Sequence, residues 1–152
     1  MPVHNNEIIT STKNSKIKEV ILLQQKTSER RKNGMFIVEG IREICHCSDS
    51  GFEIDSLYIS DEILKDESSI SKIPCNNIYR VSQDVYNKMA YRGSTEGVIA
   101  IAKRKERTLD SLQLPDNPLI VVLESVEKPG NIGAILRSAD AAGVDAVIVC
   151  DP

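Results

Sequence analysis

The sequence lacks three features that would place it outside the ordinary globular class. None of its apolar runs approaches the roughly 20 residues that cross a bilayer, so a soluble protein is expected. Its start, MPVHNNEIITS, has neither a basic segment followed by an apolar core nor an arginine-rich amphipathic pattern, so no export or transit signal is visible. Its four cysteines form no paired framework, which fits a reducing compartment better than a disulfide scaffold. We therefore expect a cytoplasmic protein without membrane attachment.

A metal site is not expected either. Cys45, His46 and Cys47 follow one another in the segment IREICHCSDSG, whose apolar residues have helical spacing. Successive side chains on a helix point about 100° apart, so these three cannot converge on one ion. No second CxxC or HxxxH pair stands elsewhere in the sequence. The pattern predicts Cys45 in the core and His46 outside it.

The formal net charge of −3 conceals two basic segments. Residues 10–47 carry 8 basic and 4 acidic side chains, and residues 80–107 carry 7 and 3. Residues 48–78 and residues 108–152 each carry 2 basic and 7 acidic side chains. Either basic segment alone could be a solvated helix face, but a phosphate-binding patch is the better account if the two meet on one surface.

The first hundred residues alternate between helical and extended patterns. The segment STKNSKIKEVILLQQKTSERRKNG predicts a helix that gives way to a short basic turn at residues 30–34. The further expected elements are a strand at 35–38, a helix from Gly40 to Gly51, a strand at 54–60, a short helix at 61–65, a strand at 77–81, a helix at 82–90 capped by Ser82, and a strand at 98–102 entered through Gly97. Such alternation is typical of an α/β sandwich with a largely parallel sheet. Residues 1–102 are predicted to form this domain, and the polar, proline-containing residues 103–118 a linker.

Residues 119–152 have the pattern of a strand, a helix and a second strand. The runs 119–123 and 146–150 are continuously apolar, as in strands that are buried on both faces. Gly143 stands where the helix would end. Four apolar residues recur at helical spacing between the strands: Ile132, Ile135, Leu136 and Ala139. The sequence therefore predicts a βαβ unit, which needs more parallel sheet beside it.

Two interpretations of the glycines in this unit are open. In the first, Gly130 and Gly133 form a nucleotide loop at the helix N-terminus, and Asp151 holds a ribose hydroxyl, as in a Rossmann-like dinucleotide fold. The loop is GxxG rather than GxGxxG, so it lacks the glycine that lets the backbone approach a pyrophosphate. The second interpretation is a family resemblance.

The stretch VVLESVEKPGNIGAILRSADAAGVDAVIVCD resembles the first motif of the SpoU (TrmH-type) RNA ribose 2′-O-methyltransferases, in which an acidic residue, a Pro-x-Asn-x-Gly turn and a following arginine recur. The corresponding residues here are Glu124, Pro129, Asn131, Gly133 and Arg137. The segments IKEVILLQQKTSERRKNGMFIVEGIREI and STEGVIAIAKR resemble the RNA-binding domain that often precedes that catalytic domain. The resemblance implies an α/β RNA-binding domain followed by the first βαβ unit of a knotted methyltransferase domain.

The resemblance also implies a reaction. Family members transfer a methyl group from S-adenosylmethionine to a ribose 2′-hydroxyl of ribosomal or transfer RNA, as homodimers. By this resemblance Glu124, Asn131 and Arg137 are the catalytic candidates, with Asn131 holding the loop and orienting the ribose. Arginine is a poor general base, so Arg137 is expected to clamp a phosphate or ribose and to stabilise developing alkoxide charge. Without the motif, Asn131 could cap the helix and Arg137 could pair with Asp140. Glu124 could be an ordinary strand-end acid.

RNA is the expected partner of the two basic segments. A non-catalytic RNA-binding module that uses these segments alone is the alternative function. Because the two further motifs of the family are not present, we expect the chain to be a fragment that neither binds S-adenosylmethionine nor catalyses transfer on its own. Its open strand edge and exposed apolar surface would favour self-association. The candidate RNA contacts are Lys13, Lys16, Lys18, Arg30, Arg31, Lys32, Arg42, Lys103, Arg104 and Lys105.

Overall fold

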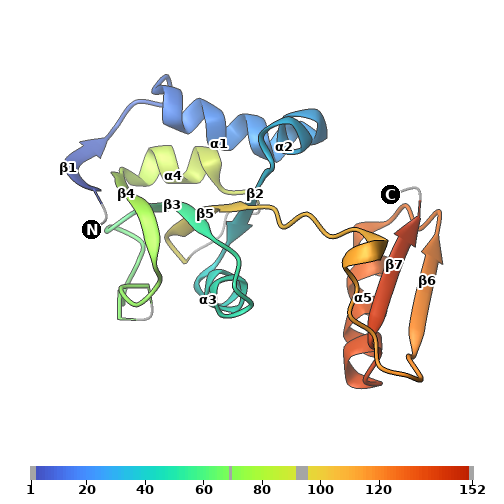
Figure 1. Cartoon of the computed structure of the whole chain (residues 1–152). Helices are drawn as coiled ribbons and strands as arrows, with labels where there is room; N and C mark the ends of the chain where they lie inside the picture. The colour runs from blue at the N-terminus through green and yellow to red at the C-terminus, as the bar shows by residue number, and fades with distance from the viewer. Residues whose placement is uncertain (1–2, 69, 92–95, 151–152) are drawn as a thin grey trace. The chain divides into compact units, whose positions relative to one another are not determined.

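The computed structural model describes residues 3–68, 70–91 and 96–150, and for residues 3–6 only the backbone. The chain forms two compact units, residues 1–105 and residues 106–152. Unit 1 contains β1 (Val3–Ile9), α1 (Ser15–Gln25), α2 (Thr27–Asn33), β2 (Met35–Glu39), α3 (Ile41–Asp49), β3 (Ile54–Ile59), β4 (Cys75–Val81), α4 (Gln83–Met89) and β5 (Val98–Lys103) (Figure 1). Unit 2 contains the 3-10 helix η1 (Leu109–Ser111), β6 (Ile120–Glu124), α5 (Pro129–Ala141) and β7 (Ala146–Cys150). No helix within these described ranges is long and apolar enough to cross a membrane.

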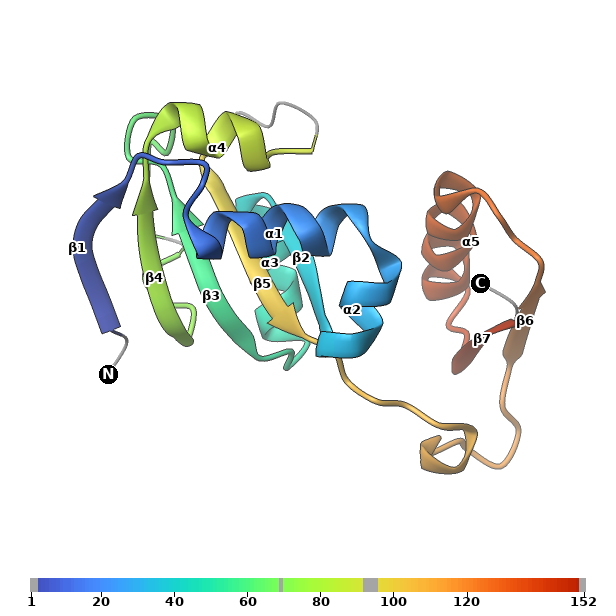
Figure 2. The ribbon, with the colours of Figure 1, turned by 90° about the horizontal axis from the view of Figure 1, so that it is seen from above.

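Unit 1 is built on one five-stranded sheet with the strand order β1-β4-β3-β5-β2 (Figure 2). On one face, Ile17 of α1 and Val85 of α4 pack with Tyr58 of β3 in a buried apolar cluster. On the other face, Ile44 of α3 packs in a second cluster with Leu57 of β3. Neighbouring residues of β3 thus point into different cores, as a strand covered on both sides requires. The predicted α/β sandwich is confirmed.

The prediction of a largely parallel sheet is wrong for half of this sheet. β1, β4 and β3 run parallel, but β5 runs antiparallel to both β3 and β2. The 7-residue α4 spans about 10 Å, whereas the 7-residue β4 spans about 23 Å, so α4 does not carry the chain back to the start of β4. β5 begins instead beside the end of β3, where the Ser60 backbone N–H donates to the Gly97 carbonyl at 2.9 Å.

The edge strand β1 has no counterpart among the elements expected from the sequence. It pairs in parallel with β4, and the register shifts between Asn5 and Ile9. The segment VHNNEII places four polar residues between apolar ends. Because an edge strand needs little apolar surface, the hydrophobic pattern alone does not reveal it.

The first helical segment is divided into two helices. α1 starts after Asn14, whose side chain accepts a hydrogen bond from the Lys16 N–H at 2.9 Å. An extended residue, Lys26, separates α1 from α2, and α2 ends at Gly34 with φ +62°. Residues 30–32 therefore lie in a helix, and the prediction of a basic turn there is wrong. Gln and Ser residues around the break carry no strong stop signal, which is why the pattern reads as one helix.

Residues 61–65 form a turn rather than the predicted short helix. The N–H groups of Ile63 and Leu64 both donate to the Ser60 carbonyl, and the helical bonding does not continue. Arg80 of β4 anchors this segment from the sheet, since its guanidinium forms ion pairs with Asp61 and Glu67. The hydrogen bond from Arg80 lowers the pKa of Glu67 below its usual range.

We expect Arg80→Ala to lower the free energy of unfolding by about 1 kcal/mol at pH 7, because the pairs are partly solvent-exposed. A carboxyl whose folded pKa is depressed contributes stability above its unfolded pKa of about 4.3 and loses it as the pH falls through the folded value. The difference between wild type and variant should therefore shrink as the pH falls below about 4. Urea denaturation at pH 7, 5, 4 and 3 measures it. The matched change Arg31→Ala removes an exposed arginine that forms no ion pair among the described residues and should stay within about 0.5 kcal/mol. A pH-independent difference for Arg80→Ala would contradict the assignment.

Unit 2 is a two-stranded parallel sheet with one helix. The register runs from Ile120 opposite Ala146 to Glu124 opposite Cys150. Helix α5 ends as predicted at Gly143, which has φ +69°, and the Val144 N–H reaches back to the Ala139 carbonyl at 3.0 Å. This six-to-one bond is a Schellman ending, which favours glycine at the left-handed position.

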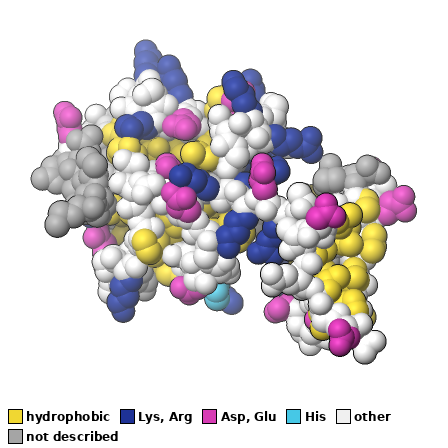
Figure 3. All heavy atoms as spheres, in the orientation of Figure 1, with side chains coloured by type: hydrophobic (Ala, Val, Ile, Leu, Met, Phe, Trp, Pro, Cys, Tyr) yellow, Lys and Arg dark blue, Asp and Glu magenta, His cyan; other side chains and the backbone are white. Residues whose placement is uncertain are grey.

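The strands of unit 2 are covered on one face rather than on both. Leu123 is buried, whereas Ile120 and Val122, which point to the other face of β6, are 37% and 61% exposed. Hydrophobic side chains gather on the exposed side of this unit (Figure 3). One helix can cover only one face of a two-stranded sheet, so the expectation of burial on both faces is not met within the described residues.

Candidate functional site

The motif residues of unit 2 lie at the end of β6 and along helix α5. Glu124 ends β6, and Cys150, opposite it, ends β7. The chain leaves β6 through Ser125, which has φ +53°, and the loop then leads to Pro129 at the start of α5. A non-glycine residue with this φ carries about 1 kcal/mol of backbone strain, a feature that is concentrated at functional sites. The carboxyl ends of parallel strands beside a helix N-terminus are where open α/β sheets bind ligands.

Arg137 lies on α5 with its guanidinium turned back along the helix. Its Nη1 is 3.7 Å from the position that a Cβ on Gly133 would occupy. Gly133 stands four residues after the start of α5, which is about 6 Å along the helix axis. The side chain is exposed, and within the described parts of the chain it forms no ion pair, so the suggested pair with Asp140 is not present. Both guanidinium edges are therefore available to an external oxygen or phosphate.

Asn131 does not cap the helix. The residue at the N-cap position of α5 is Lys128, which makes no side-chain cap bond, and Asn131 lies inside the first turn with its backbone N–H donating to the Lys128 carbonyl at 2.9 Å. Gly130 and Gly133 are also helical, so they do not form the nucleotide loop of the first interpretation. Asp151, the ribose ligand in that interpretation, lies outside the described residues. The side chains of Glu124 and Asn131 are exposed at the edge that the motif forms.

Four of the ten basic candidates already have partners within unit 1. Lys16 donates through Nζ to the Tyr79 hydroxyl at 2.7 Å. Arg30 donates to the carbonyls of Leu23 and Gln24 and to Thr27 Oγ1, so it satisfies the C-terminal carbonyls of α1. Lys103 donates to Glu53 Oε1 at 2.7 Å, and this bond lowers the pKa of Glu53. Lys105 donates to the Ser50 carbonyl and stands over the Phe52 ring. These four residues therefore have a structural role within unit 1.

The other six candidates are exposed: Lys13, Lys18, Arg31, Lys32, Arg42 and Arg104. Lysine and arginine side chains gather along the side of unit 1 that α1 and α2 form (Figure 3). The two basic segments meet there, because the Arg104 N–H donates to the carbonyl of Gly34, the last residue of the α2 turn, at 2.7 Å. Arg42 lies on α3, across the sheet, and does not join this surface. We call residues Lys13, Lys18, Arg31, Lys32 and Arg104 the basic surface.

All four cysteines are free thiols. Cys45 packs against the core cluster under α3 and His46 is exposed, as predicted. Burial raises the pKa of the Cys47 thiol, which disfavours the thiolate that a metal needs. In the described ranges no group of three His, Cys, Asp or Glu side chains could hold an ion.

One concave feature of unit 1 was not predicted from the sequence. A cavity of about 370 Å³ opens between α1, α2 and the edge strand β2. Its lining includes Gln24, Arg30, Glu39 and Tyr91. The available signal was Tyr91, an aromatic residue two positions after α4 and ahead of a polar stretch of the sequence, but its distance of 52 residues from Glu39 hides the partnership.

Two family models match the chain. Residues 14–100 match the MRM3-like substrate binding domain, and residues 118–152 match the SpoU rRNA Methylase family. Among solved structures, an RNA 2′-O ribose methyltransferase is 37% identical, with a TM-score of 0.79 over 96% of this chain and 56% of that one. The AdoMet bound rRNA methyltransferase from Sinorhizobium meliloti is 25% identical, with a TM-score of 0.78 over 94% of this chain and 54% of that one.

Curated relatives agree with these matches. The chain is 28% identical over 143 residues to RlmP of Bacillus subtilis, a 23S rRNA (guanosine(2553)-2′-O)-methyltransferase, and the match covers 94% of this chain and 54% of the relative. It is 49% identical over 59 residues to RlmB of Salmonella typhi, a 23S rRNA (guanosine-2′-O-)-methyltransferase, over 36% of this chain and 24% of the relative. The chain thus spans about half the length, or less, of the curated relatives it matches.

Proposed function

Because this chain belongs to the SpoU family of rRNA methylases, with an MRM3-like substrate binding domain ahead of a SpoU segment, we propose that the whole protein is an S-adenosylmethionine-dependent ribosomal RNA ribose 2′-O-methyltransferase. The observation that supports it most directly is the placement of the motif. Glu124 at the end of β6 and Asn131 and Arg137 on α5 are all exposed. Unit 1 then provides the RNA-binding part.

In this proposal Arg137 stabilises the reacting ribose oxygen. A 2′-hydroxyl that attacks a methyl group develops negative charge as it loses its proton, and a guanidinium aimed at that oxygen lowers the cost. Arg137 has no competing ion pair among the described residues, so its donors are available for this role. Asn131, six residues before it on α5, provides an amide that can orient the ribose.

In this proposal Glu124 and the loop 125–128 would form one wall of the cofactor site. S-adenosylmethionine would supply an electrophilic methyl group there. The chain offers it the carboxylate of Glu124 and the backbone of the loop 125–128, next to a helix start that no side chain caps. The match to RlmP covers about half of that relative. In this proposal the other contacts to S-adenosylmethionine come from the part of the whole protein that corresponds to the rest of the relative.

The decisive test is methyl transfer by a protein that joins this chain to the remaining length its relatives have. We expect radiolabel from S-adenosylmethionine to enter ribosomal RNA from a strain lacking the enzyme, and to be found on a ribose 2′-oxygen after nuclease digestion. RNA binding without any transfer would support the non-catalytic module instead. Transfer to transfer RNA alone would overturn the ribosomal substrate.

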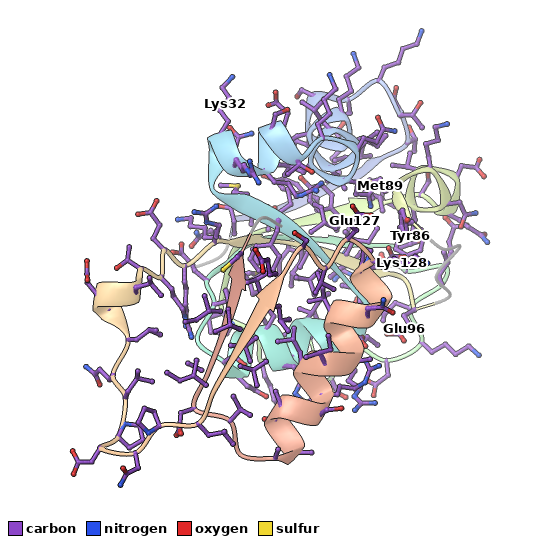
Figure 4. All side chains as sticks on the ribbon, turned by 90° about the vertical axis from the view of Figure 1, so that its right-hand side faces the viewer. Lys32, Tyr86, Met89, Glu96, Glu127 and Lys128 are labelled. Carbon is purple, nitrogen blue, oxygen red and sulfur yellow. The ribbon has the colours of Figure 1, made fainter. Side chains whose placement is uncertain are left out.

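Binding of RNA by unit 1 should rest on phosphate contacts of the basic surface. Lys32 projects from α2 away from the sheet (Figure 4). We expect Lys32→Ala to weaken binding of a structured ribosomal RNA fragment several-fold and to reduce the slope of log K against log salt by about 1. The matched change Lys103→Ala removes a lysine whose Nζ is already held by Glu53, so its slope should change less. Filter binding at four salt concentrations measures both. Equal slope changes would show that the basic surface is not the contact.

We also infer a homodimer and a cytoplasmic location. The exposed apolar face of β6 and β7, with Val122 61% exposed, supports association between copies. Four free thiols support a reducing compartment. Light scattering of the whole protein tests the inferred homodimer, and a monomer would contradict it.

A further inference from the structure

The cavity beside β2 has an opening that no strand closes. β2 is the last strand of the sheet, so its outer side faces α1, α2 and solvent rather than another strand. The volume of about 370 Å³ lies at the small end of ligand pockets, which suits one flat ring system better than an extended chain. Phe36 and Ile37 of β2 supply apolar wall, and Glu39 at the end of the strand supplies charge.

Glu39 is the unusual residue of this wall. Its Oε2 accepts a hydrogen bond from the Tyr91 backbone N–H at 3.0 Å. Its Oε1 is buried and has no hydrogen-bond partner within the described structure. An unmade bond to a buried charged oxygen is costly, so few such groups persist without a role. A ligand that brings an N–H donor would remove the cost.

The other polar groups of the cavity also offer acceptors. The amide nitrogen of Gln24 donates to the Met89 carbonyl, which leaves its amide oxygen as the acceptor. Arg30 has its terminal nitrogens directed at Leu23, Gln24 and Thr27. These N–H donors are therefore already used, and the flat face of the guanidinium is the part that a ligand in the cavity can contact. A matching ligand must carry neighbouring donors and a π surface.

Tyr91 stands at the edge of this cavity and is 76% exposed. The other three tyrosines, Tyr58, Tyr79 and Tyr86, are at most 9% exposed. An exposed tyrosine ring beside a basic surface is the usual stacking platform for an unstacked base of single-stranded RNA. The backbone N–H of Tyr91 holds the Glu39 carboxylate, so the Tyr91 ring and this carboxylate have a fixed relative position at the cavity.

We propose that this cavity binds one unpaired guanine base of the RNA substrate, stacked on Tyr91 and hydrogen-bonded to Glu39. The proposal rests on the RNA substrate of the proposed function, and it specifies which base of that RNA the cavity recognises. Guanine is the base that presents two adjacent donors, N1–H and the 2-amino group, to a carboxylate. Adenine and cytosine present an amino group beside a ring-nitrogen acceptor, and the lone pair of this acceptor repels a Glu39 carboxylate oxygen. Uracil presents one N–H between two carbonyl oxygens, which the carboxylate also repels. Because Oε1 is buried, the proposal requires the Glu39 carboxylate to rotate so that Oε1 meets the base.

The test uses single-stranded heptamers that differ at one base. The chain is titrated at fixed low salt with fluorescein-labelled oligouridylates carrying guanine, hypoxanthine, adenine, cytosine or uracil at the centre, and anisotropy is read. We expect the guanine heptamer to bind about ten-fold more tightly than those with adenine, cytosine or uracil. Hypoxanthine keeps N1–H but lacks the 2-amino group, so it should fall between. Equal affinity for all five overturns the proposal.

Two pairs of variants assign the effect to the cavity. Glu39→Gln should lose the guanine preference while binding the uracil heptamer at least as well, because one negative charge is removed. Glu19→Gln makes the same change at an exposed position of α1 that does not line the cavity, and should keep the preference. Tyr91→Ala should weaken all heptamers about ten-fold, and Tyr91→Phe should not. A guanine preference that survives Glu39→Gln also overturns the proposal.

The outcomes separate this inference from the proposed function. If structured ribosomal RNA binds and is methylated but the heptamers are not discriminated, the cavity is not a base site and the enzyme stands. If heptamers are discriminated but no methyl transfer occurs in the longer protein, the base site stands and the enzyme does not. Circular dichroism and thermal melting of Glu39→Gln and Tyr91→Ala confirm that loss of binding does not reflect unfolding.

Discussion

Arg137→Ala should lower the rate of methyl transfer by about a hundred-fold or more in a protein that carries this chain with the rest of a SpoU domain. Removing one preorganised donor from developing oxyanion charge typically costs 10² to 10³ in rate, which corresponds to about 3 to 4 kcal/mol. The side chain is exposed and bonds to no described residue, so its removal should leave the fold unchanged. Single-turnover transfer with saturating RNA isolates the chemical step from binding.

Two further variants decide what Arg137 does. Arg137→Lys keeps the positive charge but loses the planar donor fork, so it should recover part of the rate. Arg107→Ala removes another exposed arginine, which belongs neither to the motif nor to the basic surface, and should leave the saturated rate unchanged. If Arg137→Ala raises that concentration and leaves the saturated rate intact, the arginine is a binding residue and not a part of the chemistry.

The sequence predicts which elements exist in this fold better than how they are connected. Strands β3, β5, β6 and β7 carry dense apolar runs, so their place in the sequence is recognised from composition alone. The reversed direction of β5 is not visible, because it depends on the length of α4 relative to the strand it follows. β1 is not visible because its pairing is made by backbone groups, which all residues share.

The candidate site, too, could be predicted only in part from the sequence. The SpoU motif is contiguous in the sequence, so the succession of strand, loop and helix that carries Glu124, Asn131 and Arg137 could be predicted. The RNA candidates were selected by charge, and charge does not show whether a side chain is already bonded. Arg30 and Lys103 have the same composition signal as Arg31 and Lys32, yet only the latter two are exposed without a bond. The acceptors of the cavity could not be predicted either, since Gln24, Glu39 and Tyr91 come together only through the fold.

The largest effect on stability is expected at Gly97, where β5 begins. Its φ is +75°, in the left-handed region, and a Cβ there would stand 2.5 Å from the backbone nitrogen of Leu64 and 3.0 Å from the Leu64 Cα. Backbone atoms cannot rotate away as a side chain can, so the strand or the turn at residues 61–64 must shift. Gly97 also holds both neighbours in place: its carbonyl accepts from the Ser60 N–H and its N–H donates to the Tyr86 hydroxyl. Such a shift would disturb both core clusters, because Tyr86 belongs to one and Leu64 to the other.

Gly97→Ala should therefore lower the free energy of unfolding by about 3 to 5 kcal/mol, or prevent folding of unit 1. Gly34→Ala is the matched control, because Gly34 has φ +62° and a Cβ there would meet no atom within 4 Å. That substitution should cost only about 1 kcal/mol, the price of the left-handed conformation for an L-residue. At about 4 °C per kcal/mol for a domain of this size, the two melting temperatures should differ by about 10 °C. Equal decreases in melting temperature would mean that the left-handed backbone conformation alone accounts for the cost of both substitutions. The close approach of Gly97 to Leu64 would then contribute nothing to the packing of β5 against the turn.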